Sequence, residues 1–169
     1  FTNNRRVYTC FDTTGGDVKL VVWTLDAAVT TATRVGTLVA GIPENPSGRH
    51  SGCRPRVGPD GYLWIGTGDA ATGTNPQDVN SLGGKVLRVD VNNPSTPPPN
   101  GLGGGADGYV WDYGLRNPYR FSFDHATNQL YIADAGDTLY EEVEVEAQGA
   151  GHKDYGWDRY EGAGCKNGS

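Results

Sequence analysis

Hydrophobic and polar positions alternate in short runs along this chain, which is typical of β-strands with one buried face. Residues 6–11 and 18–23 form the first two runs, and Gly15 and Gly16 lie between them. Two strand-like runs joined by a Gly-Gly turn predict a β-hairpin. A third run, residues 35–39, leads into a proline-containing loop.

A longer pattern occurs twice. Residues 57–69 read as strand, tight turn, strand and glycine corner, and residues 121–137 form a diverged copy. Both contain an Asp-containing turn, then Leu-aromatic-Ile, a small residue and Gly-Asp, and Leu63 and Leu130 lie 67 residues apart. A repeat of this length built from short strands predicts blades of a β-propeller, of which the chain would cover about two and a half.

We therefore expect an all-β fold and assign residues 1–169 to part of a single β-propeller domain. A propeller needs about four to eight blades, so we expect the remaining blades to lie outside these residues. The absence of methionine fits a processed or partial chain. Between the two copies, residues 82–90 predict a strand, and the Pro- and Gly-rich residues 92–107 predict a surface loop.

Composition excludes several other classes. The 26 glycines and 10 prolines disfavour a helical bundle, because both residues are poor in helix interiors. The net charge of −6 and the lack of a basic run give no indication of a nucleic-acid partner. The longest apolar runs, such as residues 20–23, are too short to span a membrane, so no membrane span is expected.

The three cysteines are Cys10, Cys53 and Cys165. None forms a CxxC pair, so a zinc site is not expected. One interpretation is a Cys10–Cys53 disulfide, with Cys165 pairing outside the chain; the other is free, buried cysteines. Together with the acidic, Met-free composition, the cysteines favour a secreted, extracellular or periplasmic protein.

Candidate chemistry begins with His50, on a polar, glycine-flanked loop directly before a strand. Imidazole is the usual general base at neutral pH, although a lone loop histidine is more often a solvated surface residue. Asp69 and Asp137 end the two copies and would project to the same rim of a propeller. Each could hydrogen-bond its own turn, orient a histidine or help to bind a cation. Glu141 and Glu142 could also serve a cation, but their spacing is not that of an EF-hand.

Arg116 lies in the segment YGLRNP, residues 113–118. Pro118 biases Asn117 toward an extended conformation, so Arg116 is expected on a stiff turn. A guanidinium fixed in this way can hold an anion or a polarised carbonyl. A structural role, in which Arg116 ties loop carbonyls together, is equally open.

In their order along the chain, these motifs resemble the glucose/sorbosone dehydrogenase family. The resemblance covers residues 48–162 and is closest to the sorbosone or pyranose dehydrogenase-like branch. It rests on four ordered segments: residues 50–69, 82–88, 113–124 and 133–162. Members of this family are six-bladed β-propeller enzymes that use pyrroloquinoline quinone (PQQ) and calcium.

The resemblance implies a role for each matched residue. His50 would be the general base that removes the proton of a sugar hydroxyl, and Asp69 would orient it. Arg116 would contact the quinone oxygen, and Asn117 would be the adjacent cofactor contact. Lys85, by contrast, is matched to a blade strand rather than to the site.

The implied function is that of a quinoprotein sugar dehydrogenase, which oxidises an aldose or related sugar by hydride transfer to PQQ. The main-chain carbonyls of Gly136 and Asp137 match the calcium ligands. The expected partner is the sugar substrate, and no motif specifies the electron acceptor. One alternative is a secreted propeller that binds a protein or carbohydrate without redox chemistry, as in hedgehog-interacting-protein-like propellers. Another is an inactive piece, because half of the cofactor cage would lie elsewhere.

Overall fold

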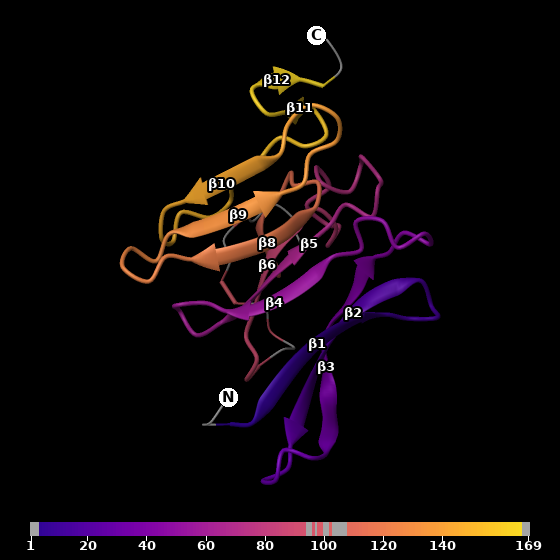
Figure 1. Ribbon diagram of the computed structural model, residues 1–169, viewed down its shortest axis with the longest axis vertical. Helices are drawn as coiled ribbons and strands as arrows, with labels where there is room; N and C mark the ends of the chain where they lie inside the picture. The colour runs from indigo at the N-terminus through magenta and orange to yellow at the C-terminus, as the bar shows by residue number, and fades with distance from the viewer. Residues whose placement is uncertain (1–3, 94–95, 97, 100–101, 103–107, 167–169) are drawn as a thin grey trace.

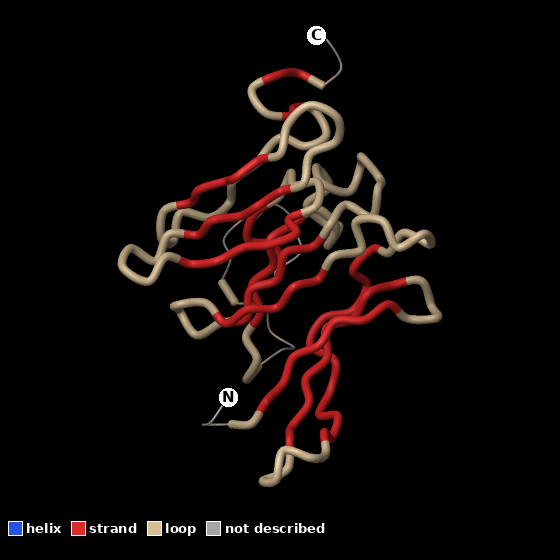
Figure 2. Tube along the Cα trace, in the orientation of Figure 1, coloured by secondary structure: helices blue, strands red, loops and turns tan. Residues whose placement is uncertain are grey.

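The computed structural model describes residues 4–93, 96, 98–99, 102 and 108–166. Within these residues every regular element is a strand, which confirms the all-β expectation (Figure 2). The strands are β1 (Arg6–Asp12), β2 (Asp17–Leu25), β3 (Ala32–Pro43), β4 (Cys53–Val57), β5 (Leu63–Thr67), β6 (Lys85–Val89), β7 (Val110–Asp112), β8 (Pro118–Phe123), β9 (Leu130–Asp134), β10 (Glu142–Glu146), β11 (Tyr160–Glu161) and β12 (Gly164–Cys165). No helix in the described residues could cross a membrane.

The described strands form sheets in the order of the chain. They are β1-β2-β3, β4-β5-β6-β7 and β8-β9-β10, followed by the hairpin β11-β12, and all pairs are antiparallel. Figure 1 shows the sheets following one another from the bottom of the view to the top. Each is an up-and-down meander, as in a propeller blade. The two copies of the repeat are the first two strands of successive sheets, since Leu63 begins β5 and Leu130 begins β9.

Two clusters of buried side chains hold the sheets together. Side chains of β5 alternate between the clusters: Leu63 and Ile65 pack toward β1–β3, and Trp64 packs toward β8–β10. Because successive residues of a strand point to opposite faces, both faces of the middle sheet are covered. This explains why all five residues of β5 are buried.

Cys10 in β1 and Cys53 at the start of β4 form a disulfide, which confirms the Cys10–Cys53 pairing of the first interpretation. Within the described part of the chain, Cys165 is free and exposed. The disulfide joins the first sheet to the second across 43 residues. His50 lies close before Cys53, so the bond also fixes one end of the loop that carries the histidine. The loop expected over residues 92–107 lies largely outside the described residues.

Lys85 lies in β6 and is fully buried. Its ammonium donates hydrogen bonds to the carbonyls of Asn75, Pro76 and Gly83 at 2.6, 3.1 and 2.6 Å. Burial lowers the pKa of Lys85 to about 7. These contacts anchor the long loop that connects β5 to β6, and Asp69 lies at the start of that loop. The position of Lys85 in a strand agrees with the structural role implied by the resemblance.

Candidate active site

The candidate residues lie on loops at one end of the second and third sheets. His50 precedes β4 and Asp69 follows β5, and these two strands are antiparallel neighbours. Arg116 precedes β8 and Asp137 follows β9, which gives the same arrangement in the next sheet. The four side chains line one open pocket of ≈ 180 Å³. The sequence therefore identified residues that the fold brings together.

His50 is paired with Asp69, and its side chain is only 12% exposed, so it is not a solvated surface residue. The distance from Nδ1 of His50 to Oδ1 of Asp69 is 2.7 Å. A carboxylate only accepts hydrogen bonds, so Nδ1 carries the proton of this pair. In the neutral imidazole, Nε2 is then left as the proton acceptor. This is the arrangement that a general base requires.

A close backbone contact brings the His50 loop to the end of β5. A Cβ on Gly68 would lie 2.1 Å from the carbonyl oxygen of His50, so only glycine fits. The same carbonyl accepts the backbone N–H of Ala70 at 3.2 Å. His50 has a left-handed backbone with φ 51°. The side-chain amide of Asn45 donates to the carbonyl of Ala70 at 3.0 Å, which ties the two loops together.

Asp69 is 2% exposed and is held through both carboxylate oxygens. Besides His50, Oδ1 accepts the backbone N–H of Ala71 at 2.7 Å. Oδ2 accepts the indole N–H of Trp157 at 2.9 Å. The backbone N–H of Asp69 donates to the carbonyl of Arg116 at 2.8 Å. Asp69 therefore bonds its own turn and orients the histidine at the same time.

The Arg116 side chain is buried at the edge of this pocket. Its guanidinium donates to the carbonyl of Ala135 at 3.1 Å and to Oδ1 of Asp137 at 2.9 Å. It also lies 5.3 Å from the ring of Trp157, a cation–π contact. The guanidinium is thus fixed by a carbonyl, a carboxylate and an aromatic ring.

The turn that carries Arg116 is held by Asp134, which the sequence did not identify. The carboxylate of Asp134 accepts the backbone N–H groups of Arg116 and Asn117 at 2.9 and 2.6 Å. Burial raises the pKa of Asp134 to about 7, although these two hydrogen bonds oppose the shift. The side-chain oxygen of Asn117 lies beside Gly68, 3.0 Å from the position of a Cβ there. Asn117 is therefore close to the His50 loop.

Trp157 and Lys166 also line the pocket, and sequence reasoning gave neither of them a role. The ammonium of Lys166 lies 3.7 Å from the centre of the Trp157 ring and 3.3 Å from Oδ2 of Asp137. The motif DYGW at residues 154–157 was the available signal for Trp157. Nothing in the local sequence around Lys166 distinguishes it from a surface lysine.

The loop that follows β9 contains the two residues matched to the calcium ligands, Gly136 and Asp137. A Cβ on Gly136 would lie 1.6 Å from the carbonyl oxygen of Tyr140, so the loop closes tightly on this glycine. Oε1 of the buried Glu161 accepts four successive backbone N–H groups, from residues 137–140. These hydrogen bonds, that of Leu139 foremost, lower the pKa of Glu161 to about 2.

Comparison with known proteins identifies the family. The family model for Glucose / Sorbosone dehydrogenase matches residues 1–167. The chain belongs to the glucose/sorbosone dehydrogenase family. This family is one of PQQ-dependent sugar dehydrogenase-like proteins with a β-propeller fold, and the chain covers about two to three blades.

The proteins similar to this chain include aldose sugar dehydrogenases and the plant HIPL proteins. The PQQ-bound form of the aldose sugar dehydrogenase from Streptomyces coelicolor has a TM-score of 0.83 and 29% identity, over 99% of this chain and 48% of that one. Aldose sugar dehydrogenase YliI of Escherichia coli is 27% identical over 93% of this chain and 43% of its own. The HIPL2 protein of Arabidopsis thaliana is 37% identical over 72% of this chain and 20% of its own. The chain spans less than half the length of these proteins.

The residues on this rim fit the cofactor of the glucose/sorbosone dehydrogenase family. PQQ is a planar, anionic quinone, and it needs cationic hydrogen-bond donors. Arg49, Arg116 and Lys166 line the same pocket as His50, together with Asp69, Asp137 and Asp158, and Asp137 is paired with both Arg116 and Lys166. Guanidinium groups in particular match carboxylates and carbonyl oxygens in fixed geometry.

Side chains alone do not build a calcium site in the described residues, because no group of three or more His, Cys, Asp or Glu could hold a metal there. The loop at Gly136 and Asp137 instead offers main-chain carbonyls, which calcium accepts as ligands. Oε2 of Glu161 is buried beside it without a hydrogen-bond partner in the described residues. Glu141 and Glu142 are occupied by the N–H groups of Gly136 and Gly162. Oxygen donors suited to calcium therefore exist at this loop.

Proposed function

We propose that this chain is part of a PQQ- and calcium-dependent oxidoreductase that oxidises an aldose or related sugar, with His50 as the general base. The observation that carries the proposal is the shared pocket of the His50–Asp69 pair and Arg116. The His50–Asp69 pair is held by the second sheet and Arg116 by the third. The hydrogen bond from the backbone N–H of Asp69 to the carbonyl of Arg116 joins the two sheets at this point.

His50 would remove the proton of the substrate hydroxyl through Nε2. Asp69 would stabilise the imidazolium that forms, because its carboxylate already accepts the Nδ1 proton. When bound, PQQ supplies the two-electron acceptor for the hydride that leaves the substrate carbon. The backbone contact at Gly68 and the indole of Trp157 would hold the histidine and the carboxylate in fixed relative positions.

Arg116 would bind and stabilise negative charge on a cofactor oxygen in the pocket. Its position is fixed beforehand by Ala135 and Asp137, so little reorganisation is needed when charge develops. Asn117 would make the adjacent cofactor contact. The main-chain carbonyls of Gly136 and Asp137 would hold calcium.

The Cys10–Cys53 disulfide supports a secreted or periplasmic location, because such bonds persist in oxidising compartments. A sugar dehydrogenase in that location would act on external sugars.

A second function has a specific observation in its favour. The chain is 37–38% identical to the plant proteins HIPL1 and HIPL2 but 27% identical to the aldose sugar dehydrogenase YliI. In this alternative the propeller binds a protein or carbohydrate partner and performs no redox chemistry.

The deciding experiment replaces His50 in the intact protein, supplied with PQQ and calcium, and measures sugar-dependent dye reduction. His50→Asn suits the site, because asparagine tolerates the left-handed backbone at this position. We expect turnover to fall by about 10²-fold or more, while PQQ absorbance still shows a bound cofactor. The matched control is His125→Asn, an exposed histidine in the turn before β9.

Near-normal dye reduction by His50→Asn would remove His50 from the mechanism. Absence of both bound PQQ and dye reduction in the unmodified protein would favour the binding function instead.

A further inference from the structure

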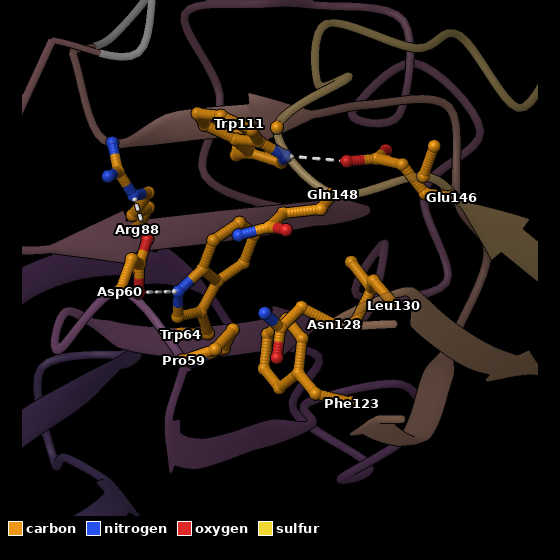
Figure 3. Close-up of a pocket in the computed structure, with 12 residues that line it drawn as sticks. Pro59, Asp60, Trp64, Arg88, Trp111, Phe123, Asn128, Leu130, Glu146 and Gln148 are labelled. Atoms are coloured by element: carbon orange, nitrogen blue, oxygen red, sulfur yellow. Dashed lines mark hydrogen bonds and ion pairs between the residues drawn. The ribbon is translucent and has the colours of Figure 1, made fainter. Parts of the chain in front are cut away.

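A second pocket lies at the opposite end of the strands from His50. Trp64 of β5, Trp111 of β7 and Phe123 of β8 contribute aromatic rings to it, and Asn128 and Gln148 lie at its mouth (Figure 3). We call it the aromatic pocket. Trp64 is near the start of β5, whereas Asp69 follows the end of that strand. The aromatic pocket therefore opens on the other rim and plays no part in the proposed reaction.

The aromatic pocket has room for a bare six-membered ring, so the substituents of a larger ligand would have to lie at its opening. Its volume is ≈ 140 Å³. An apolar cavity of about 150 Å³ is large enough to hold benzene. The ring centres of Trp64 and Trp111 are 5.1 Å apart, and those of Trp64 and Phe123 are 5.3 Å apart, both edge to face. Trp64 and Trp111 are only 5% and 8% exposed, so a ligand in this pocket would touch a small part of each ring and must be apolar there.

The charged groups of the aromatic pocket are already paired within the protein. Asp60 accepts the indole N–H of Trp64 at 2.9 Å and binds Arg88 at 2.8 Å. Glu146 accepts the indole N–H of Trp111 at 2.9 Å. The guanidinium of Arg88 lies 5.0 Å from the ring of Trp111, so a cationic ligand would meet a resident cation. An anionic ligand would meet two carboxylates. The pocket therefore favours a neutral ligand.

Two side-chain amides supply the polar contacts. Neither Asn128 nor Gln148 makes a side-chain hydrogen bond with the described residues. Figure 3 shows both amides beside the aromatic rings. The backbone N–H of Asn128 donates to the carbonyl of Asp124 at 2.8 Å, which fixes this turn. An amide both donates and accepts, as a hydroxyl group does, so hydroxyl groups are suitable partners.

The required ligand is thus a neutral six-membered ring with one apolar face and a rim of hydroxyl groups. A pyranose has this chemistry. We propose that the aromatic pocket binds one pyranose unit of a neutral carbohydrate, independently of the site at His50. The ring would pack on the Trp64 and Trp111 side, and its hydroxyl groups would bond Asn128 and Gln148.

The test uses NMR of the intact protein with ¹⁵N-labelled indoles. Methyl glycosides of glucose, galactose and mannose serve as probes, and cyclohexanol serves as the ring without a hydroxyl rim. At least one glycoside should shift the indole signals of Trp64 and Trp111 saturably, with a dissociation constant of about 1–10 mM. The shifts of Trp64 and Trp111 should not depend on any shift of Trp157, which lies in the pocket proposed to hold the sugar substrate.

The double variant Asn128→Gly with Gln148→Ala removes both amides. Glycine tolerates the φ of 56° at position 128, so the turn is kept. We expect the affinity for the glycoside to fall at least about tenfold, from the loss of two hydrogen bonds. Gln129→Ala is the matched control, since Gln129 is in the same turn but does not line the pocket and should leave the affinity unchanged.

Three results would overturn the proposal: no saturable shift with any glycoside up to about 100 mM, equal affinity for cyclohexanol, or unchanged affinity in the double variant. The outcome is separate from that of the proposed function. His50→Asn lies on the other rim and should leave glycoside binding at the aromatic pocket intact.

Discussion

Replacing Trp157 with phenylalanine tests how the Asp69 carboxylate is held. The substitution removes the indole N–H that lies 2.9 Å from Oδ2 of Asp69, in a fully buried contact. It keeps an aromatic ring beneath Arg116 and Lys166. The variant therefore isolates one hydrogen bond to a buried carboxylate.

The structure sets the size of the effect. A hydrogen bond to a charged group contributes about 1.5–3 kcal/mol, and a buried oxygen left without its donor loses this in full. Asp69 is 2% exposed, so water cannot easily replace the indole. We expect the free energy of unfolding to fall by about 2–3 kcal/mol for Trp157→Phe. Because Asp69 orients His50, sugar oxidation should fall as well.

Trp23→Phe is the matched control for the loss of an indole N–H. Its indole N–H bonds the hydroxyl of Thr9 at 2.8 Å, a neutral and only partly buried partner. We expect a loss of about 0.5–1 kcal/mol in this case. Urea denaturation of Trp157→Phe and Trp23→Phe compares the two losses of stability. The same measurement on Asp69→Asn, alone and combined with Trp157→Phe, gives the coupling energy between Trp157 and Asp69. Equal losses for the two tryptophans, or no coupling between Trp157 and Asp69, would refute the reasoning.

Three further outcomes are expected. Gly68→Ala places a Cβ 2.1 Å from the carbonyl of His50, so His50 must move, and dye reduction should fall at least about tenfold even where circular dichroism shows a folded protein. Lys85→Met leaves three carbonyls without their donor, and denaturation should show a loss of about 3 kcal/mol or more. Burial and the adjacent Glu146 raise the pKa of Asp112 to about 8, above its unfolded value, so this group stabilises the fold at low pH and loses that contribution as the pH rises from about 4 to 8. Asp112→Asn should remove this dependence, which is at most about 1.4 kcal/mol per pH unit for one proton, and denaturation across that range measures it.

The sequence predicted the strands whose hydrophobic pattern is regular. The hairpin of β1 and β2, the repeated strand pairs and the position of Lys85 in β6 follow from local alternation and turn residues. The local sequence pattern predicts strand ends less well, because pairing with a neighbouring strand determines where a strand ends. β3 extends over Ala32–Pro43, well beyond the predicted residues 35–39, because the residues on both sides of that run also pair with β2. The acidic β10 was not identified, because its covered positions are glutamates and its two valines are exposed, the reverse of the usual hydrophobic pattern.

The candidate site was predicted unevenly for a similar reason. His50, Asp69 and Arg116 stand in motifs with distinctive spacing, so they could be found from the chain. Asp134 could not, because its contacts are to backbone N–H groups of a turn far away in sequence. Lys166 joins the pocket only through the folding of the C-terminal segment against Asp137.

The position of the proposed base depends on whether the disulfide between β1 and β4 is oxidised or reduced. The loop that presents His50 is the last stretch of the ring that Cys10 and Cys53 close. A reductant that opens this ring would release one anchor of the loop, while Gly68 and Asp69 would remain on their own strand end. Formation of this disulfide would then be a condition for the loop geometry at His50, which a reduced chain would lack.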